Sequence, residues 1–299
     1  MTTKGEKPYY RLVGKPRQGH VLLVHGFAME HRLWLPSIAP LLNQFQFILP
    51  DLRGFGRSSH LEIPKECVVN INADDIEQAV NELGIEKLYL GGFSLGGLIS
   101  MELLKRWGSD RVIKFLNIDQ SAKPVSDDSW PYGLGGMRGS EFLSMAEGIL
   151  SEVGKYPDEI DFSKLPEEVR GIVYEGFGLF LANAVSGVVP KKVSPLIFKI
   201  PRVRDRLSIF RSWQSTISVI RSYVNENYDY RELLNKIDLP VTYMVGGKSD
   251  IYPKKGQVIT HESTPESTLV TFQKSGHDLL LKEPIKFSRE LKKFLSEAA

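Results

Sequence analysis

The chain has 299 residues, 42% of them hydrophobic and 25% charged, a composition typical of a packed globular protein. Its 38 basic and 36 acidic side chains leave a formal net charge of +2, which argues against a nucleic-acid partner. The single cysteine, Cys67, excludes an intrachain disulfide and a multi-cysteine metal cluster, and it suits a reducing compartment.

The first ten residues, "MTTKGEKPYY", are polar and lack the apolar core of a secretory signal. No later run reaches the roughly eighteen apolar residues that a membrane-spanning helix needs. We therefore expect a cytoplasmic protein with no integral membrane segment.

Short apolar runs and helical patterns alternate in the first 120 residues. Runs that end at polar or glycine residues predict strands at 20–25, 45–50, 87–93 and 112–119. Between them, Ile76, Val80 and Leu83 share one face of a predicted helix over 73–84, where Gly84 is placed to end it. A second helical pattern follows Ser94. Strands alternating with helices predict right-handed crossovers and a mostly parallel sheet.

The alternation breaks after "NIDQS" and returns with strand-like runs at 240–247 and 267–276. A final amphipathic helix is predicted to begin at Pro284, because proline suits the first helical turn. We expect a sheet-based core interrupted by a mainly helical insertion, divided as core 1–120 and 236–299 and cap 121–235.

The segment "GGFSLGG" at residues 91–97 places a serine in a Gly-x-Ser-x-Gly pattern between a predicted strand and a predicted helix. A nucleophile elbow requires that context, because a serine on a sharp strand-to-helix turn exposes its hydroxyl. Gly92 and Gly96 remove side chains that would clash with neighbouring backbone. The simpler alternative is a glycine-rich strand end, or an anion-binding turn.

Four segments in order resemble the α/β-hydrolase superfamily: "HGF" at 25–27 followed by Trp34, "DLRGFGRS" at 51–58, "GGFSLGG" at 91–97 and "GHDLLLKEP" at 276–284. The resemblance covers nearly the whole chain outside the cap. It implies an α/β fold with a mostly parallel twisted sheet, flanking helices and an inserted helical cap.

A serine hydroxyl needs a base to take its proton and a third group to orient that base. For Ser94, the resemblance and the chain order of this fold indicate His277 as the base. Asp250, shortly after the strand at 240–247, occupies the usual position of the acid in the family. Asp119 is the rival, since some branches of the family take the acid from the preceding strand.

The other histidines are expected to have no catalytic role. His25 resembles a structural residue of the oxyanion loop. We expect His20, His31 and His60 to be solvated near loops or strand ends, and His261 to lie in an exposed connection.

The resemblance also implies that the backbone N–H groups of Phe27 and Leu95 form an oxyanion hole, where donors stabilise developing negative charge. Asp51 and Arg53 are expected to brace loops. Ala28 stands where many cofactor-free haloperoxidase relatives have proline, which makes that branch a poorer match.

Apolar residues of the cap are candidates for a substrate pocket, since ligand sites are mostly apolar with a few polar groups. The alternative is that each merely packs cap helices onto the core. The basic stretch 191–206 could contact anionic lipid or a partner, although a solvated surface is the simpler interpretation. The candidate pocket residues are Trp130, Tyr132, Met137, Phe142 and Phe177.

Together these features predict a serine hydrolase that cleaves small to medium carboxylic esters through an acyl-enzyme on Ser94. Lactone or carbon–carbon bond hydrolysis with the same triad stays open, as does a hydrolase-like ligand receptor or signalling protein. Serine at this position argues against haloalkane dehalogenases and epoxide hydrolases, which resemble this fold but use aspartate. Metal-binding histidine motifs and a dinucleotide fingerprint are absent, so no metal or cofactor is expected, and the protein would be a monomer or homodimer.

Overall fold

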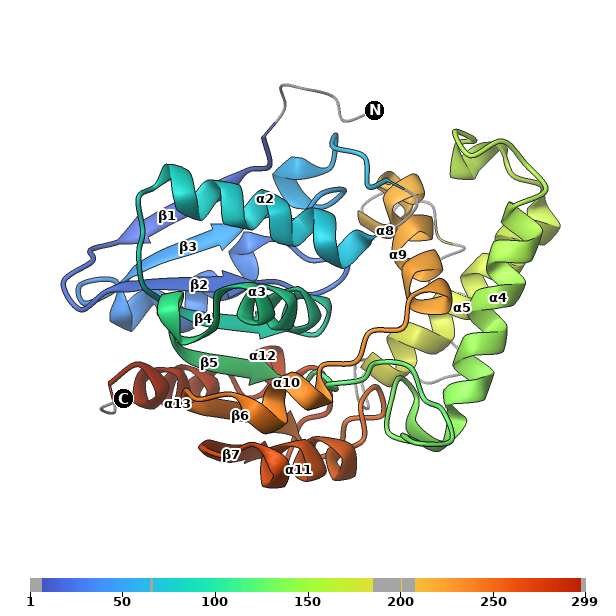
Figure 1. Ribbon diagram of the computed structural model, residues 1–299. Coiled ribbons are helices and arrows are strands. Elements are labelled where there is room, and N and C mark those ends of the chain that lie inside the picture. The colour runs from blue at the N-terminus through green and yellow to red at the C-terminus, as the bar shows by residue number, and fades with distance from the viewer. Residues whose placement is uncertain (1–6, 65–66, 185–199, 201–207, 297–299) are drawn as a thin grey trace.

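The computed structural model describes residues 7–64, 67–184, 200 and 208–296 (Figure 1). Its centre is a seven-stranded sheet in the order β1-β3-β2-β4-β5-β6-β7. All six strands predicted from apolar runs are present, which confirms the expected sheet. The strands are β1 (Tyr10–Gly14), β2 (His20–Val24), β3 (Gln46–Pro50), β4 (Leu88–Phe93), β5 (Val112–Ile118), β6 (Val241–Gly246) and β7 (Ser267–Phe272).

The additional strand β1 lies at one edge of the sheet and is the one antiparallel member. It pairs with β3 from Tyr10 opposite Pro50 to Gly14 opposite Gln46, whereas β2 to β7 pair in parallel. The side chains of β1 are half-buried or exposed, as expected of an edge strand. The hydropathy pattern did not predict β1, because a strand with a solvated face has no continuous apolar run.

Helices cover both faces of the sheet, and successive residues of β2 contact them alternately. Leu22 and Val24 pack in the hydrophobic cluster that includes α2 (Val68–Glu82) and α3 (Leu95–Arg111). Val21 and Leu23 pack in a second cluster, with α1 (Leu35–Ile38) and α13 (Pro284–Ser296). The remaining core helices are α10 (Arg231–Lys236), α11 (Lys254–Ser263) and α12 (Leu279–Lys282).

Helix α2 illustrates how the local pattern determines an element. Val69, Ala73, Ile76 and Val80 recur at helical spacing and are all buried. The helix begins at Val68, before the predicted start at 73, because Val68 and Val69 extend the buried stripe. It ends at Glu82, and Gly84 then adopts a φ of 65°, as expected of a glycine that terminates a helix.

The chain between β5 and β6 forms helices that lie beyond the carboxyl ends of the strands (Figure 1). They share a third hydrophobic cluster, which includes Ile149, Phe162, Val173 and Trp213. The division at 121 and 235 stays a prediction, and the basic stretch 191–206 lies outside the described residues apart from Ile200. These helices are α4 (Gly139–Val153), α5 (Glu167–Ala184), α8 (Ser208–Arg211) and α9 (Trp213–Asn225).

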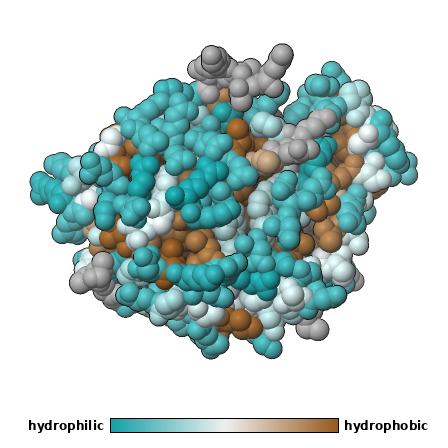
Figure 2. Space-filling view, in the orientation of Figure 1, coloured by the Kyte–Doolittle hydropathy of each residue, from teal (hydrophilic) through white to brown (hydrophobic). Residues whose placement is uncertain are grey.

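The face shown in Figure 2 is mainly hydrophilic where α2 crosses it, and hydrophobic side chains appear in patches between the hydrophilic ones. Within the described ranges, none of the helices combines the length and hydrophobicity needed to cross a membrane.

Candidate active site

Ser94 occupies the turn between β4 and α3 in a strained backbone conformation, with φ 53° and ψ −126°. Two glycines make this turn possible. A Cβ on Gly92 would lie 2.2 Å from the carbonyl oxygen of Gly96, and a Cβ on Gly96 would lie 2.2 Å from that of Val24. The structure therefore gives Gly92 and Gly96 the steric role predicted from the sequence.

His277 lies against the Ser94 hydroxyl, as expected from the order of motifs. Its Nε2 is 2.9 Å from Ser94 Oγ, although 183 residues separate the two in sequence. The imidazole is buried, and two aromatic rings flank it, those of Phe93 and Tyr252, with centroids 4.8 Å and 6.0 Å away. These contacts restrict the orientation of the imidazole beside the serine.

The acid that contacts His277 is Asp119, so the choice of Asp250 is corrected. Asp119 Oδ2 lies 2.7 Å from His277 Nδ1, whereas Asp250 is exposed. A carboxylate oxygen only accepts hydrogen bonds, so Nδ1 carries the proton and Nε2 is left to accept from the Ser94 hydroxyl.

The misassignment has a structural cause, since β5 and β6 are neighbours in the sheet. Ile118 pairs with Met244, so residues that follow either strand reach the same edge. The loop after β6 does reach the site, but through Ser249, whose Oγ donates to Asp119 Oδ2 at 2.7 Å. Residue spacing does not determine which of two adjacent loop residues turns inward.

Asp119 is fully buried and accepts further hydrogen bonds that the sequence did not indicate. Gly246 N–H and Gln257 Nε2 both donate to its Oδ1, at 2.8 Å and 3.0 Å. The residue has a φ of 46°, a left-handed conformation that Asp tolerates better than most side chains. Gln257 and Ser249 are thus supporting residues that only the tertiary structure reveals.

His25 anchors the loop that carries Phe27. Its Nδ1 donates to the Gly26 carbonyl at 2.8 Å, and its Nε2 accepts from Leu52 N–H at 3.0 Å. Burial lowers the pKa of His25 below its ordinary value, so the ring is neutral near pH 7. This arrangement supports the structural role predicted for His25.

The residues predicted to supply the oxyanion donors lie close to Ser94. Leu95 is the first residue of α3, where backbone N–H groups have no intrahelical acceptor. Phe27 lines the same cavity as Ser94, and a Cβ on the preceding Gly26 would lie 3.2 Å from Ser94 Cβ. The oxyanion hole itself stays a prediction.

An apolar cavity of about 100 Å³, here called the inner cavity, opens onto Ser94. Two tyrosine hydroxyls, those of Tyr223 and Tyr252, face each other on its wall at 3.5 Å. Burial raises the pKa of Tyr252 to about 12 and that of Tyr223 well above its ordinary value, so both are neutral. Further wall residues are Leu134, Phe142, Met145, Phe177 and Phe180.

Of the predicted pocket residues, Phe142 and Phe177 line the inner cavity, but Trp130 and Tyr132 lie elsewhere. Trp130 and Tyr132 pack edge to face, with ring centroids 5.3 Å apart, and Tyr132 closely covers Gly256 of α11. Both residues therefore pack the first part of the insertion, after β5, onto the core. The side chain of Met137 lies outside the described residues.

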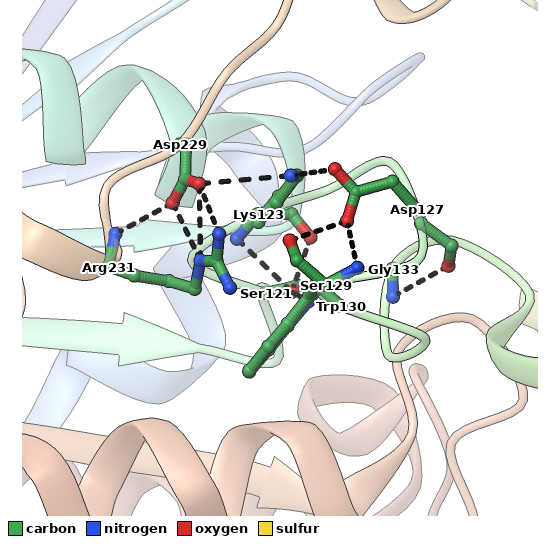
Figure 3. A network of polar contacts seen from close by, with 9 residues as sticks. Ser121, Lys123, Asp127, Ser129, Trp130, Gly133, Asp229 and Arg231 are labelled. Atoms are coloured by element: carbon green, nitrogen blue, oxygen red, sulfur yellow. Dashed lines mark hydrogen bonds and ion pairs between the residues drawn. The ribbon is translucent and has the colours of Figure 1, made fainter.

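A polar network connects the beginning and the end of the insertion between β5 and β6 (Figure 3). The buried ammonium of Lys123 pairs with Asp127 and lies 3.8 Å from an oxygen of Asp229, which in turn binds Arg231 at 2.6 Å. The Arg231 guanidinium lies over the ring of Trp130. The network fixes the loop that leads to Leu134 of the cavity wall.

Among the described residues, Glu30, His31 and Asp51 have the spacing of a metal site. The Asp51 carboxylate, however, already accepts from His31 N–H at 2.6 Å and from Arg57 N–H at 2.8 Å, and it also contacts the His31 ring. His31 is therefore buried rather than solvated, contrary to expectation, and Asp51 braces loops as predicted.

Arg53 has the bracing role expected of it. Its guanidinium binds the carboxylate of Asp75 on α2 through two nitrogens, and its backbone N–H donates to Asn72. His261 lies on α11 and contacts Ser267 at 2.7 Å, so it is not in an exposed connection.

The sheet is mostly parallel, a serine occupies a strained turn after one of its strands, and a histidine and a carboxylate lie in line behind that serine. This arrangement is typical of the α/β-hydrolase fold. A model of the alpha/beta hydrolase fold family matches residues 19–145. The chain therefore has the α/β-hydrolase fold.

Similar proteins were found across most of the chain. Pimeloyl-acyl-carrier-protein methyl ester esterase from Legionella pneumophila (strain Corby) is 24% identical over 257 residues, which cover 86% of this chain and 87% of that protein. An esterase structure from Exiguobacterium antarcticum has a TM-score of 0.71 at 22% identity, covering 99% of this chain and 97% of that one. A bromoperoxidase structure from Bacillus anthracis has a TM-score of 0.71 at 20% identity, covering 97% and 95%.

The neutral, buried state of His25 predicts a loss of stability in mild acid. Since its pKa is lowered in the folded protein, the unfolded state binds more protons below the ordinary value of 6.5. The free energy of unfolding should fall by up to about 1.4 kcal/mol per pH unit below that value, until the folded pKa is reached. Urea denaturation between pH 7.5 and 5, with His25→Gln for comparison, measures this. An unchanged slope in His25→Gln would contradict the assignment.

The network around Lys123 predicts a stability difference between a buried and an exposed lysine. Lys123→Met should lower the free energy of unfolding by about 1–2 kcal/mol, because two carboxylates lose a cation that is 6% exposed. Lys155→Met, which breaks an exposed pair with Glu152, should change it by less than about 0.5 kcal/mol. Chemical denaturation of both variants provides the test, and equal losses would count against a structural role for the network.

Proposed function

We propose that this protein is a serine hydrolase that cleaves small carboxylic esters through an acyl-enzyme on Ser94. The observation that carries the proposal is the unbroken chain of hydrogen bonds from Asp119 through His277 to Ser94, beside an apolar cavity. A serine in that chain can lose its proton as it attacks a carbonyl carbon.

In the first half of the reaction, Ser94 Oγ attacks the ester carbonyl and its proton passes to His277 Nε2. The buried Asp119 carboxylate stabilises the imidazolium that forms and keeps Nδ1 protonated. His277 then gives the proton to the departing alcohol. In the second half, a water molecule repeats the attack on the acyl-enzyme, and the carboxylic acid leaves Ser94.

The tetrahedral intermediates carry negative charge on the former carbonyl oxygen. We assign its stabilisation to the backbone N–H groups of Phe27 and Leu95, where a preorganised donor typically contributes about 3–4 kcal/mol. Leu95 lies at the amino end of α3, whose dipole also favours negative charge. His25, through Gly26, holds the loop of the other donor.

The inner cavity supports a small, uncharged acyl or alkyl group. A dry cavity of about 150 Å³ binds benzene in another protein, so a cavity of about 100 Å³ suits a group of fewer than six carbons. The described lining residues carry no charge, and Tyr223 and Tyr252 are neutral phenols, so a carboxylate would be desolvated there without a cation.

Names of similar proteins are consistent with ester hydrolysis. The Legionella pneumophila relative and the Exiguobacterium antarcticum structure are both named as esterases. The bromoperoxidase from Bacillus anthracis shares the fold to the same degree, but Ala28 departs from the proline of that branch, and an esterase remains the better match.

Ser94→Ala is the direct test of the nucleophile. The wild-type protein should turn over 4-nitrophenyl acetate and butanoate many times per active site, and faster than the octanoate. Ser94→Ala should lower kcat by at least about 10⁴-fold, because the acyl-enzyme no longer forms. Steady-state and burst kinetics measure both quantities. A single slow turnover with retained ligand would instead identify a receptor, and full activity in Ser94→Ala would refute the mechanism.

A pair of matched carboxylate variants tests which acid orients His277. Asp119→Asn should lower kcat by about 10³- to 10⁴-fold, because an amide favours the wrong imidazole tautomer. Asp250→Asn should change kcat less than about twofold, since Asp250 is exposed. Circular dichroism of both variants controls for folding. A larger loss in Asp250→Asn than in Asp119→Asn would restore the acid predicted from the sequence.

A further inference from the structure

A second cavity, here called the outer chamber, lies next to the inner cavity, between the segment at 125–138 and helices α4 and α9. Its volume is about 280 Å³, against about 100 Å³ for the inner cavity. Exposed residues, Pro131 and Ser140, border it, so the chamber reaches the surface. The proposed reaction at Ser94 does not use this space.

The two cavities share one wall, which is a single layer of side chains. Leu134, Phe142, Ala146 and Tyr223 line both spaces, and Phe142 has the bulkiest wholly apolar side chain of the four. Phe142 is 4% exposed, and its ring packs directly over Gly135, where a Cβ would lie 2.3 Å from Cδ2. The ring is therefore fixed against the loop instead of free to swing aside.

The outer chamber has the lining expected for the distal part of an aliphatic chain. Carbon surfaces of Val125, Leu143 and Val224 form much of its wall. Its polar groups include Ser126, Ser140 and Asp127, and the Asp127 carboxylate is already paired with Lys123. An alkyl chain could lie against the carbon surfaces without a buried charge facing it.

We propose that Phe142 and Leu134 are the partition that sets the length of the ester chain this enzyme accepts, and that the outer chamber is the extension of the substrate site behind it. The proposal rests on the proposed ester hydrolysis. It names an aliphatic chain of the substrate as the occupant, which can belong either to the acyl group or to the alcohol.

Phe142→Ala is the central experiment, with two substrate series. The first varies the acyl chain of 4-nitrophenyl esters from C2 to C10, and the second varies the alkyl group of alkyl acetates over the same range. Removing the ring should raise the ratio of kcat/KM for C8 over C4 at least tenfold in one series, which identifies the arm that occupies the chamber. Each methylene that enters an apolar space contributes about fourfold.

Two further variants keep the test decisive if Phe142→Ala folds poorly. Leu134→Ala opens the same wall from the loop and should shift the ratio in the same direction. Phe162→Ala removes a ring of similar burial from the third hydrophobic cluster; Phe162 itself lines neither cavity, so this variant should leave the ratio unchanged. Retained C4 turnover with an unchanged ratio in both wall variants would overturn the partition while leaving the esterase proposal intact.

A binding measurement separates the inference from the catalytic proposal. In a Ser94→Ala background, calorimetry with methyl butanoate and methyl octanoate reports occupancy without chemistry. Adding Phe142→Ala should tighten binding of methyl octanoate relative to methyl butanoate at least tenfold. An unchanged ratio of dissociation constants would refute the extension of the site, whether or not the wild-type protein hydrolyses esters.

Discussion

The buried carboxylate of Asp119 is the constraint on which the site depends. A charge removed from water needs several hydrogen bonds, and Asp119 accepts them from Gly246, Ser249, Gln257 and His277. These donors come from the end of β6, the following loop, helix α11 and the segment after β7. Because one side chain connects them all, these elements of the core determine the position of the imidazole.

Features that depend on neighbouring residues could be predicted from the sequence. The apolar runs of β2 to β6 are buried at nearly every position, and Gly92 and Gly96 are required by a turn only a few residues long. The pairing of Ser94 with His277 could also be predicted, because the resemblance to the α/β-hydrolases fixes the order in which the serine and the histidine occur along the chain. Strand β1 was missed because its five residues, "YRLVG", include the charged Arg11 and form no apolar run long enough to stand out.

Features that depend on which side chain turns inward could not be predicted. Asp119 and Asp250 both follow strands that end at the same edge, and only the packing of the loop after β6 makes Ser249 the inward-facing residue. The same limit applies to the aromatic residues of the cap. Phe142 and Phe177 line the inner cavity, while Trp130 is used against Arg231, and composition does not distinguish these uses.

In the proposed mechanism, reactivity and selectivity therefore depend on separate parts of the molecule. The contacts among Ser94, His277 and Asp119 are held by buried hydrogen bonds at strand ends, whereas the two cavities are bounded by α4, α9 and the loop that follows Lys123. Charged contacts of Lys123 connect that loop, which carries Leu134, to the segment around Asp229 that follows α9 (Figure 3). If the proposed partition is correct, a change in the wall alters the accepted chain length without moving Asp119, because no wall residue donates to its carboxylate among the hydrogen bonds described.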